Sequence, residues 1–223
     1  MKKKDSFPFC RYLAVWLWGI LLIGCATPPP TDNIIASAVL YPPPPNPPRL
    51  QYLTSLSGAS DIIPKQSAFA EFVAGKDPKE AMAITKPYGL TFFQGNLFVA
   101  DIRGARYGIF DFAQRDFKFV TGTGNGKMRD PVNIAVDVDG TKYITDSGTK
   151  QIMVFDGNDR FVTAYGVVDQ FKPSGIAIAA DRLYISDLEH NTIHVLQKQT
   201  GDVLFTFGNS GKKAGEFFWP TNI

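Results

Sequence analysis

The sequence predicts an all-β protein assembled from repeated four-stranded sheets, and two observations support this. A phrase of the form Pro-x-(Gly/Asn)-(Leu/Ile) recurs with prolines 44, 42 and 47 residues apart, at Pro87, Pro131, Pro173 and Pro220. Each interval between these prolines holds four short runs rich in β-branched and aromatic residues, and no stretch inside the repeats has helical periodicity. Four antiparallel strands at this period form one blade of a β-propeller.

Turn signals divide each repeat into its strands. The second run reads LFVAD, KYITD or LYISD and ends at Asp101, Asp146 or Asp187, and the third run reads YGIFD, IMVFD or IHVLQ. Pairs such as Asp139-Gly140 between the runs are typical of hairpin turns. Because Asp favours turns, we expect the aspartate that ends the second run to cap the following turn through the backbone.

Alternation along the second run predicts that both faces of a blade are apolar. Leu97 and Val99 fall on one face, and Phe98 with its equivalents Tyr143 and Tyr184 falls on the other. Each blade can therefore pack against a neighbour on either side.

The repeat pattern resembles the NHL repeat. Pro-x-(Gly/Asn)-Ile is followed after about ten residues by (Leu/Lys)-(Tyr/Phe)-(Val/Ile)-x-Asp and then by (Ile/Val)-x-Val-Phe-Asp, at the spacing of one blade. The resemblance covers Pro87 to Ile223, and the unit PVNIAVDVDGTKYITDSGTKQIMVFD matches best. The third repeat departs from it, because Thr192 stands where a basic residue usually precedes the third strand. The resemblance implies a β-propeller of NHL-type four-stranded blades.

The repeats account for three blades, whereas propellers typically have ~4 to 8. We therefore expect residues 87–223 to be the first blades of a ring of six, in a longer protein of roughly 330 to 350 residues. Residues 49–86 precede the repeats. Within them, Arg49–Ser57 is predicted as a lone strand that completes the last blade on ring closure, and Ser67–Ala74 as a short helix with Gly75 as its C-cap. The helical insert is expected to cover a blade edge or one mouth of the ring.

The N-terminus resembles a bacterial lipoprotein signal. Residues 1–24 combine a lysine-rich start with the apolar run Tyr12–Ile23, which is short for a membrane span and suits a signal peptide. Leu22-Ile23-Gly24-Cys25 resembles a lipobox, which implies cleavage before Cys25 and its lipidation. A retained membrane anchor and a free thiol are the competing interpretations. Residues 25–48 hold nine of the 16 prolines and are predicted to form a semi-rigid polyproline tether.

This resemblance places the protein in the bacterial cell envelope. Ala26 after the lipidated cysteine favours the outer membrane, with the domain facing the periplasm. The net charge of +2 becomes −1 once the +3 of the first 24 residues is set aside. Binding to nucleic acid needs clustered Lys and Arg, so the charge gives no support for a nucleic-acid partner.

No catalytic motif is present: the sequence lacks His-Glu-x-x-His, Gly-x-Ser-x-Gly, a Walker loop and Cys-x-x-Cys. His190 and His194 have helical ligand spacing but lie in the strand-like HNTIHVL, which argues against a metal pair. We therefore predict a binding or scaffolding module for a protein, peptide or glycan and assign no catalytic or metal-binding residue. The candidate binding residues lie in the loops after the recurring aspartates: Arg103, Arg106, Lys150, Glu189 and His190.

The alternative is a metal-dependent propeller enzyme. Lyases and lactonase-like hydrolases with similar propeller repeats hold a metal in the central channel, so this alternative predicts a calcium or zinc ion there. The ligands would come from inner-strand positions, which in this chain are Gly89, Asn133, Gly175 and Asn222.

Overall fold

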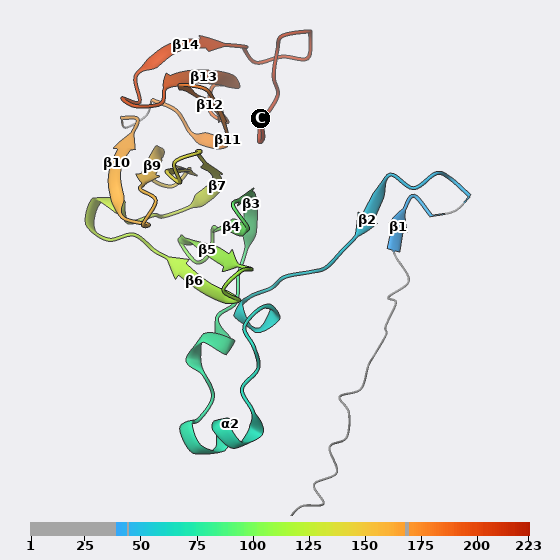
Figure 1. The fold of residues 1–223 in the computed structure, drawn as a ribbon. Helices are drawn as coiled ribbons and strands as arrows, with labels where there is room; N and C mark the ends of the chain where they lie inside the picture. Colours follow the sequence, from blue (N-terminus) through green and yellow to red (C-terminus); the bar gives the residue numbers. More distant parts are fainter. Residues whose placement is uncertain (1–38, 44, 168–169) are drawn as a thin grey trace, which may run out of the picture. The chain divides into compact units, whose positions relative to one another are not determined.

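The computed structural model describes residues 39–43, 45–167 and 170–223. The chain divides into two compact units, and the boundary in the sequence lies between Thr54 and Ser55. The second unit contains three four-stranded antiparallel sheets, which Figure 1 draws in green, yellow and orange to red. The chain is therefore an all-β protein with three blades of an incomplete propeller. The predicted signal peptide, Cys25 and the start of the tether lie outside the described residues. Among the described residues, no helix has the length and apolar character needed to cross a membrane.

The first unit contains a two-stranded antiparallel sheet of β1 (Val39–Tyr41) and β2 (Leu50–Tyr52), with Val39 opposite Tyr52. The predicted strand at 49–57 is thus shorter than expected, and it is not alone, because its partner precedes the proline run of the tether. Val and Tyr are good strand formers, and a partner close in sequence costs little loop entropy. Closure of a ring by this segment stays a prediction.

The strands of each blade pair in chain order. The first blade has β3 (Pro87–Phe93), β4 (Asn96–Asp101), β5 (Arg106–Asp111) and β6 (Asp116–Val120). The second has β7 (Pro131–Val136), β8 (Lys142–Asp146), β9 (Gln151–Phe155) and β10 (Phe161–Tyr165). The third has β11 (Pro173–Ala179), β12 (Arg182–Asp187), β13 (Thr192–Gln197) and β14 (Val203–Phe207). The β4–β5, β8–β9 and β12–β13 turns therefore lie at one end of the strands, and the turns within β3–β4 and β5–β6 lie at the other.

Short helices lie before and between the blades. They are the 3-10 helices η1 (Ala59–Asp61), η2 (Pro78–Ala81) and η3 (Gly124–Gly126) and the α-helix α2 (Ala68–Ala74). Helix α2 confirms the predicted one. The Ser67 hydroxyl accepts the N–H of Ala70 at 3.2 Å, and Gly75 ends the helix at φ 80°, where a residue without Cβ is favoured. The segment around η1 packs on a face of blade 1 through Ala59 and Ile62, whereas helix α2 buries none of its residues, so the covering of a blade edge or ring mouth by this helix stays a prediction.

Two apolar clusters hold neighbouring blades together. Phe98 and Ile109 of the first blade pack with Ile144 and Phe155 of the second. In the same way, side chains of the second blade pack with side chains of the third: Tyr143, Ile152 and Tyr165 with Ile176, Leu183 and Ile185. The alternation predicted for the second strand is confirmed, because Val99 lies in the cluster on the other face of blade 1.

The recurring aspartates are fully buried and tie each blade to the segment before it. Asp146 accepts four backbone N–H groups, at 2.6 and 3.0 Å from Arg129 and Asp130 before β7 and at 3.0 and 2.9 Å from Gly148 and Thr149 in the β8–β9 turn. The predicted turn cap is confirmed. Its second role, anchoring the approach to the first strand, follows from tertiary structure.

Asp101 makes the corresponding contacts in the first blade. Its carboxylate accepts the N–H groups of Thr85 and Lys86 at 3.1 and 2.7 Å and the Arg106 Nε at 3.2 Å. Burial alone would raise the pKa of Asp101, but the hydrogen bonds from Lys86, Thr85 and Arg106 outweigh it and hold the pKa below its ordinary value.

Replacing Asp101 by Asn is therefore expected to lower the free energy of unfolding at pH 7 by about 2 kcal/mol, because an amide cannot accept all of these donors. The pKa of Asp101 is lower in the folded protein than in the unfolded chain, where it is about 3.9, so the ionised carboxylate stabilises the fold fully above that pH. This stabilisation is lost as the pH falls through the folded pKa. Urea unfolding between pH 7 and pH 3 should show a shallower acid loss in Asp101→Asn than in the parent. As a control, Asp111→Asn, at a turn carboxylate that accepts one backbone N–H from Gln114, should change the midpoint little. Equal effects of the two variants would contradict the anchoring role.

Candidate functional site

Four of the five predicted binding residues lie in the turns at one end of the strands, which we call the turn face. Arg103 is exposed in the β4–β5 turn, Lys150 lies in the β8–β9 turn, and Glu189 and His190 lie in the β12–β13 turn. The structure brings Lys150 and Glu189 together, with Lys150 Nζ 3.0 Å from Glu189 Oε2. This ion pair joins the second blade to the third across 39 residues of sequence.

The fifth residue, Arg106, begins β5, and its guanidinium is engaged inside the first blade. Its Nε donates to Asp101 at 3.2 Å and its Nη2 to the Ala83 carbonyl at 3.1 Å. The guanidinium carbon lies 3.3 Å from the centre of the Phe119 ring, a cation–π contact. Arg106 thus supports the Asp101 anchor with donors that a ligand would otherwise use.

A cleft of about 420 Å³ opens beside the Lys150–Glu189 pair. It is lined by side chains of three kinds, two cationic, one acidic and two apolar: Lys150, Lys172, Glu189, Leu188 and Trp219. The Trp219 backbone N–H donates to Asn191 Oδ1 at 2.8 Å, which ties the C-terminal segment to the β12–β13 turn. An indole beside charged groups of both signs can contact an extended peptide or a sugar ring and also pair with its polar groups.

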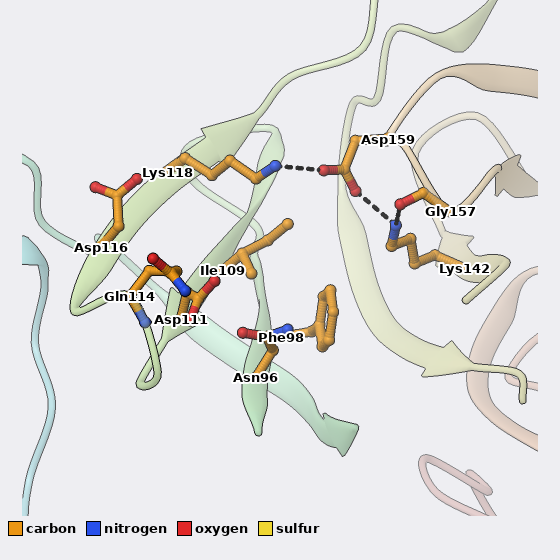
Figure 2. Close-up of a pocket in the computed structure, with 10 residues that line it drawn as sticks. All are labelled: Asn96, Phe98, Ile109, Asp111, Gln114, Asp116, Lys118, Lys142, Gly157 and Asp159. Atoms are coloured by element: carbon orange, nitrogen blue, oxygen red, sulfur yellow. Dashed lines mark hydrogen bonds and ion pairs between the residues drawn. The ribbon is translucent and has the colours of Figure 1, made fainter. Parts of the chain in front are cut away.

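A second pocket, of about 240 Å³, lies between the first two blades at the opposite end of the strands (Figure 2). Its lining combines an apolar floor with amide, carboxylate and ammonium groups: Asn96, Phe98, Ile109, Asp111, Gln114, Asp116, Lys118, Lys142, Gly157 and Asp159. The sequence did not predict this pocket, because its residues come from two repeats and from turns that carry no shared signature.

The charged wall of this pocket is a closed network around Asp159, as Figure 2 shows. Both Lys118 Nζ and Lys142 Nζ lie 2.7 Å from the Asp159 carboxylate, and the Tyr107 hydroxyl donates to it at 3.0 Å. Burial alone would raise the pKa of Asp159, but hydrogen bonds from Lys118 and Lys142 outweigh it and keep the pKa below its ordinary value. Burial, reinforced by the nearby Asp159 charge, raises the pKa of Tyr107. The network locks the two blades together rather than offering an ionisable group for catalysis.

The four predicted inner-strand positions do converge. Asn133 Nδ2 donates to Asn222 Oδ1 at 3.2 Å, a contact between positions 89 residues apart. A Cβ on Gly89 would collide with Asn133, and one on Gly175 would lie 2.8 Å from the Asn222 Cα. Glycine at these two positions therefore lets the inner strands approach closely.

The structure also gathers Asp187, His190 and His194, which the sequence analysis did not bring together. We expected both histidines in one strand, whereas His190 lies in the β12–β13 turn and His194 in β13. The turn folds His190 back towards Asp187, which is why strand periodicity failed here. The spacing Asp-x-x-His-x-x-x-His across a hairpin is the signal that could have identified the group.

Comparison with known proteins supports the fold. No protein-family model matches the chain, and no curated protein sequence matches it. The chain is similar to a solved streptogramin B lyase, with a TM-score of 0.50 and 18% identity, over 62% of this chain and 45% of that one. It is also similar to a chain of a nidogen–laminin complex (TM-score 0.48, 14% identity, 58% of this chain, 52% of that one). A third similar structure is the WD40 β-propeller domain of Doa1 (TM-score 0.45, 12% identity, 60% of this chain, 42% of that one). The chain spans about half the length of these proteins, and the likeness is one of β-propeller fold.

The Asp159 network predicts unequal costs for its two lysines. Lys142 is buried and also donates to the carbonyls of Asp156 and Gly157, at 2.9 and 3.0 Å, whereas Lys118 is largely exposed. Lys142→Met should lower the free energy of unfolding by about 3 kcal/mol, because it removes a buried cation from the largely buried Asp159 carboxylate and leaves two carbonyls without their donor. Lys118→Met, the matched control, should cost at most about 1 kcal/mol. Urea unfolding measures both, and similar costs would show that the network does not hold the blades together.

Proposed function

We propose that this chain belongs to an NHL-type, six-bladed β-propeller lipoprotein that binds a protein, peptide or glycan at the bacterial cell envelope. The proposal is carried by the cleft on the turn face between the second and third blades. There the Lys150–Glu189 pair, Lys172 and the indole of Trp219 face one opening. Charged groups of both signs around an aromatic side chain suit recognition of a partner better than turnover of a small substrate.

A metal-dependent enzyme, with its site in the central channel, is the second proposal. It is favoured by the convergence of Gly89, Asn133, Gly175 and Asn222 on the inner strands. Two of these residues lack a side chain, and the amides of the other two bond to each other. The binding function therefore has the stronger support among the described residues.

We also propose that lipidated Cys25 holds the protein on the outer membrane, with the propeller in the periplasm. Several acyl chains on one cysteine bind a membrane stably, whereas one chain binds it marginally. The prolines of residues 25–48 would keep the propeller away from the membrane surface.

Cys25→Ser is expected to abolish lipidation and to leave the uncleaved signal segment on the protein. The measurement is the intact mass of the protein extracted from membranes, together with its release by high salt or by detergent. Cys10→Ser is the matched control and should be processed and lipidated like the parent. A parent protein that carries an unmodified Cys25 would contradict the anchor.

Partner binding can be tested by exchanging the charges of the Lys150–Glu189 pair. Glu189→Lys should weaken capture of an envelope partner by about tenfold or more, which corresponds to about 1.4 kcal/mol. The double variant Lys150→Glu/Glu189→Lys restores an internal ion pair, so it should recover stability without recovering the partner. Quantitative affinity purification from solubilised envelopes measures capture, and thermal unfolding measures stability.

Lys79→Glu is the control, because Lys79 forms an exposed ion pair with Asp116 at the other end of the strands. It should leave capture unchanged. Full capture by the charge-exchanged protein would contradict recognition at this cleft. Hydrolase or lyase turnover that disappears on chelation would favour the enzyme instead.

A further inference from the structure

Three side chains of the third blade point their ligand atoms at one spot. The His190 Nδ1 lies 2.6 Å from Asp187 Oδ2, and the His194 Nε2 lies 3.0 Å from the same oxygen. The three ligand atoms lie within 4.8 Å of one another. A carboxylate oxygen and two imidazole nitrogens form a donor set that suits zinc and related transition metals.

The Asp187 carboxylate is held in place by the backbone. Its Oδ1 accepts the N–H of Lys172 at 3.0 Å and the N–H of Glu189 at 2.8 Å, and the residue is fully buried. Both bonds use Oδ1, so Oδ2 is left to face the imidazoles. A carboxylate oriented by second-shell hydrogen bonds is typical of metal sites.

The His194 ring is oriented in the same way. Its Nδ1 lies 2.9 Å from the Thr206 hydroxyl on β14, and the ring packs at 5.4 Å from the ring of Phe171. These contacts direct Nε2 towards Asp187. The side chain is only 12% exposed, whereas that of His190 is 50% exposed, so the cluster opens to solvent on the His190 side.

Comparison of the three blades shows that the fold does not require these histidines. In the first blade, Arg106 lies opposite Asp101 in the strand register and donates to it. In the second, the turn residues Gly148 and Thr149 donate their N–H groups to Asp146. In the third, Thr192 occupies the position of Arg106, and two imidazoles face Asp187 instead.

We propose that Asp187 Oδ2, His190 Nδ1 and His194 Nε2 bind one divalent transition-metal ion of the zinc class, with the remaining position open to solvent. In a tetrahedral site with bonds of ~2.0 to 2.1 Å, ligand atoms lie about 3.3 Å apart. The distances from Oδ2 to His190 Nδ1 and to His194 Nε2 must therefore widen by about 0.7 and about 0.3 Å. His190, in an exposed turn, can provide this movement. The site lies on the second and third strands of its blade and on the turn between them, and it does not depend on the proposed binding function.

Zinc binding can be measured on the full chain in detergent, without a polyhistidine tag and with Cys10 and Cys25 replaced by serine so that no thiol competes. The two histidines of the chain are those of the cluster, which keeps the background low. Isothermal titration of the chelator-treated protein with Zn²⁺ should show one equivalent bound with a dissociation constant in the micromolar range or tighter. Cobalt should bind the same site and give the visible absorption of a tetrahedral ion.

His190→Gln and His194→Gln are each expected to weaken zinc binding by at least tenfold. Asp202→Asn changes an exposed carboxylate of the same blade, outside the cluster, and should leave the affinity within about twofold. Circular dichroism shows whether each variant is folded, and His190→Gln is the decisive one because its side chain is half exposed in a turn.

Nitrogen NMR of the two imidazoles reports directly on metal coordination, and a change in protein stability alone would not alter these resonances in the same way. Zinc should shift the resonance of Nδ1 in His190 and of Nε2 in His194, leaving the other nitrogen of each ring protonated. Failure of the parent to bind zinc saturably would overturn the proposal. Binding by both histidine variants with the affinity of the parent would overturn it as well.

Discussion

Each blade depends on the hydrogen bonds that the buried aspartate at the end of its second strand accepts. Its carboxylate accepts backbone N–H groups from two places, the segment before the first strand and the turn after the second strand. The approach to β7 and the β8–β9 turn are therefore held together by Asp146. Because an isolated buried charge is costly, the carboxylate keeps its place only while these donors surround it. Any loop that the propeller presents on its turn face is built on this anchor.

The blades depend on one another through packing on both faces. Phe98 and Tyr143 occupy equivalent positions, and each packs towards the following blade. At one point this apolar contact is supplemented by charge: Lys142 begins β8 beside the ring of Phe98 and closes the Asp159 network with Tyr107 of the first blade. Apolar burial supplies most of the stability, whereas the network fixes how one blade meets the next, since its donors fit one geometry.

Local patterns predicted most of the fold and few of the contacts at the site. The repeat spacing, strand alternation, the helix between Ser67 and Gly75 and the Asp turn caps all follow from nearby residues, and the structure has each of them. What the sequence missed joins distant residues. Three such contacts are the β1–β2 pairing, the ion pair between Lys150 and Glu189, which are 39 residues apart, and the contact of His190 with Asp187. Each depends on the tertiary path of the chain. Arg106 was predicted to bind a ligand because it is a charged residue in a loop position, but in the structure its guanidinium donates to Asp101.

In the third repeat the proposed metal site uses the same buried aspartate that anchors the other two blades. Asp187 Oδ1 accepts the backbone N–H groups of Lys172 and Glu189, and Oδ2 faces the imidazoles of His190 and His194. An arginine there, as at Arg106, satisfies the second oxygen permanently, because its guanidinium stays protonated. Imidazoles at His190 and His194 satisfy it only conditionally, since a neutral ring can donate a proton or accept a metal. Replacing the permanent donor by conditional ones keeps the anchor for folding and leaves the same carboxylate available to a ligand.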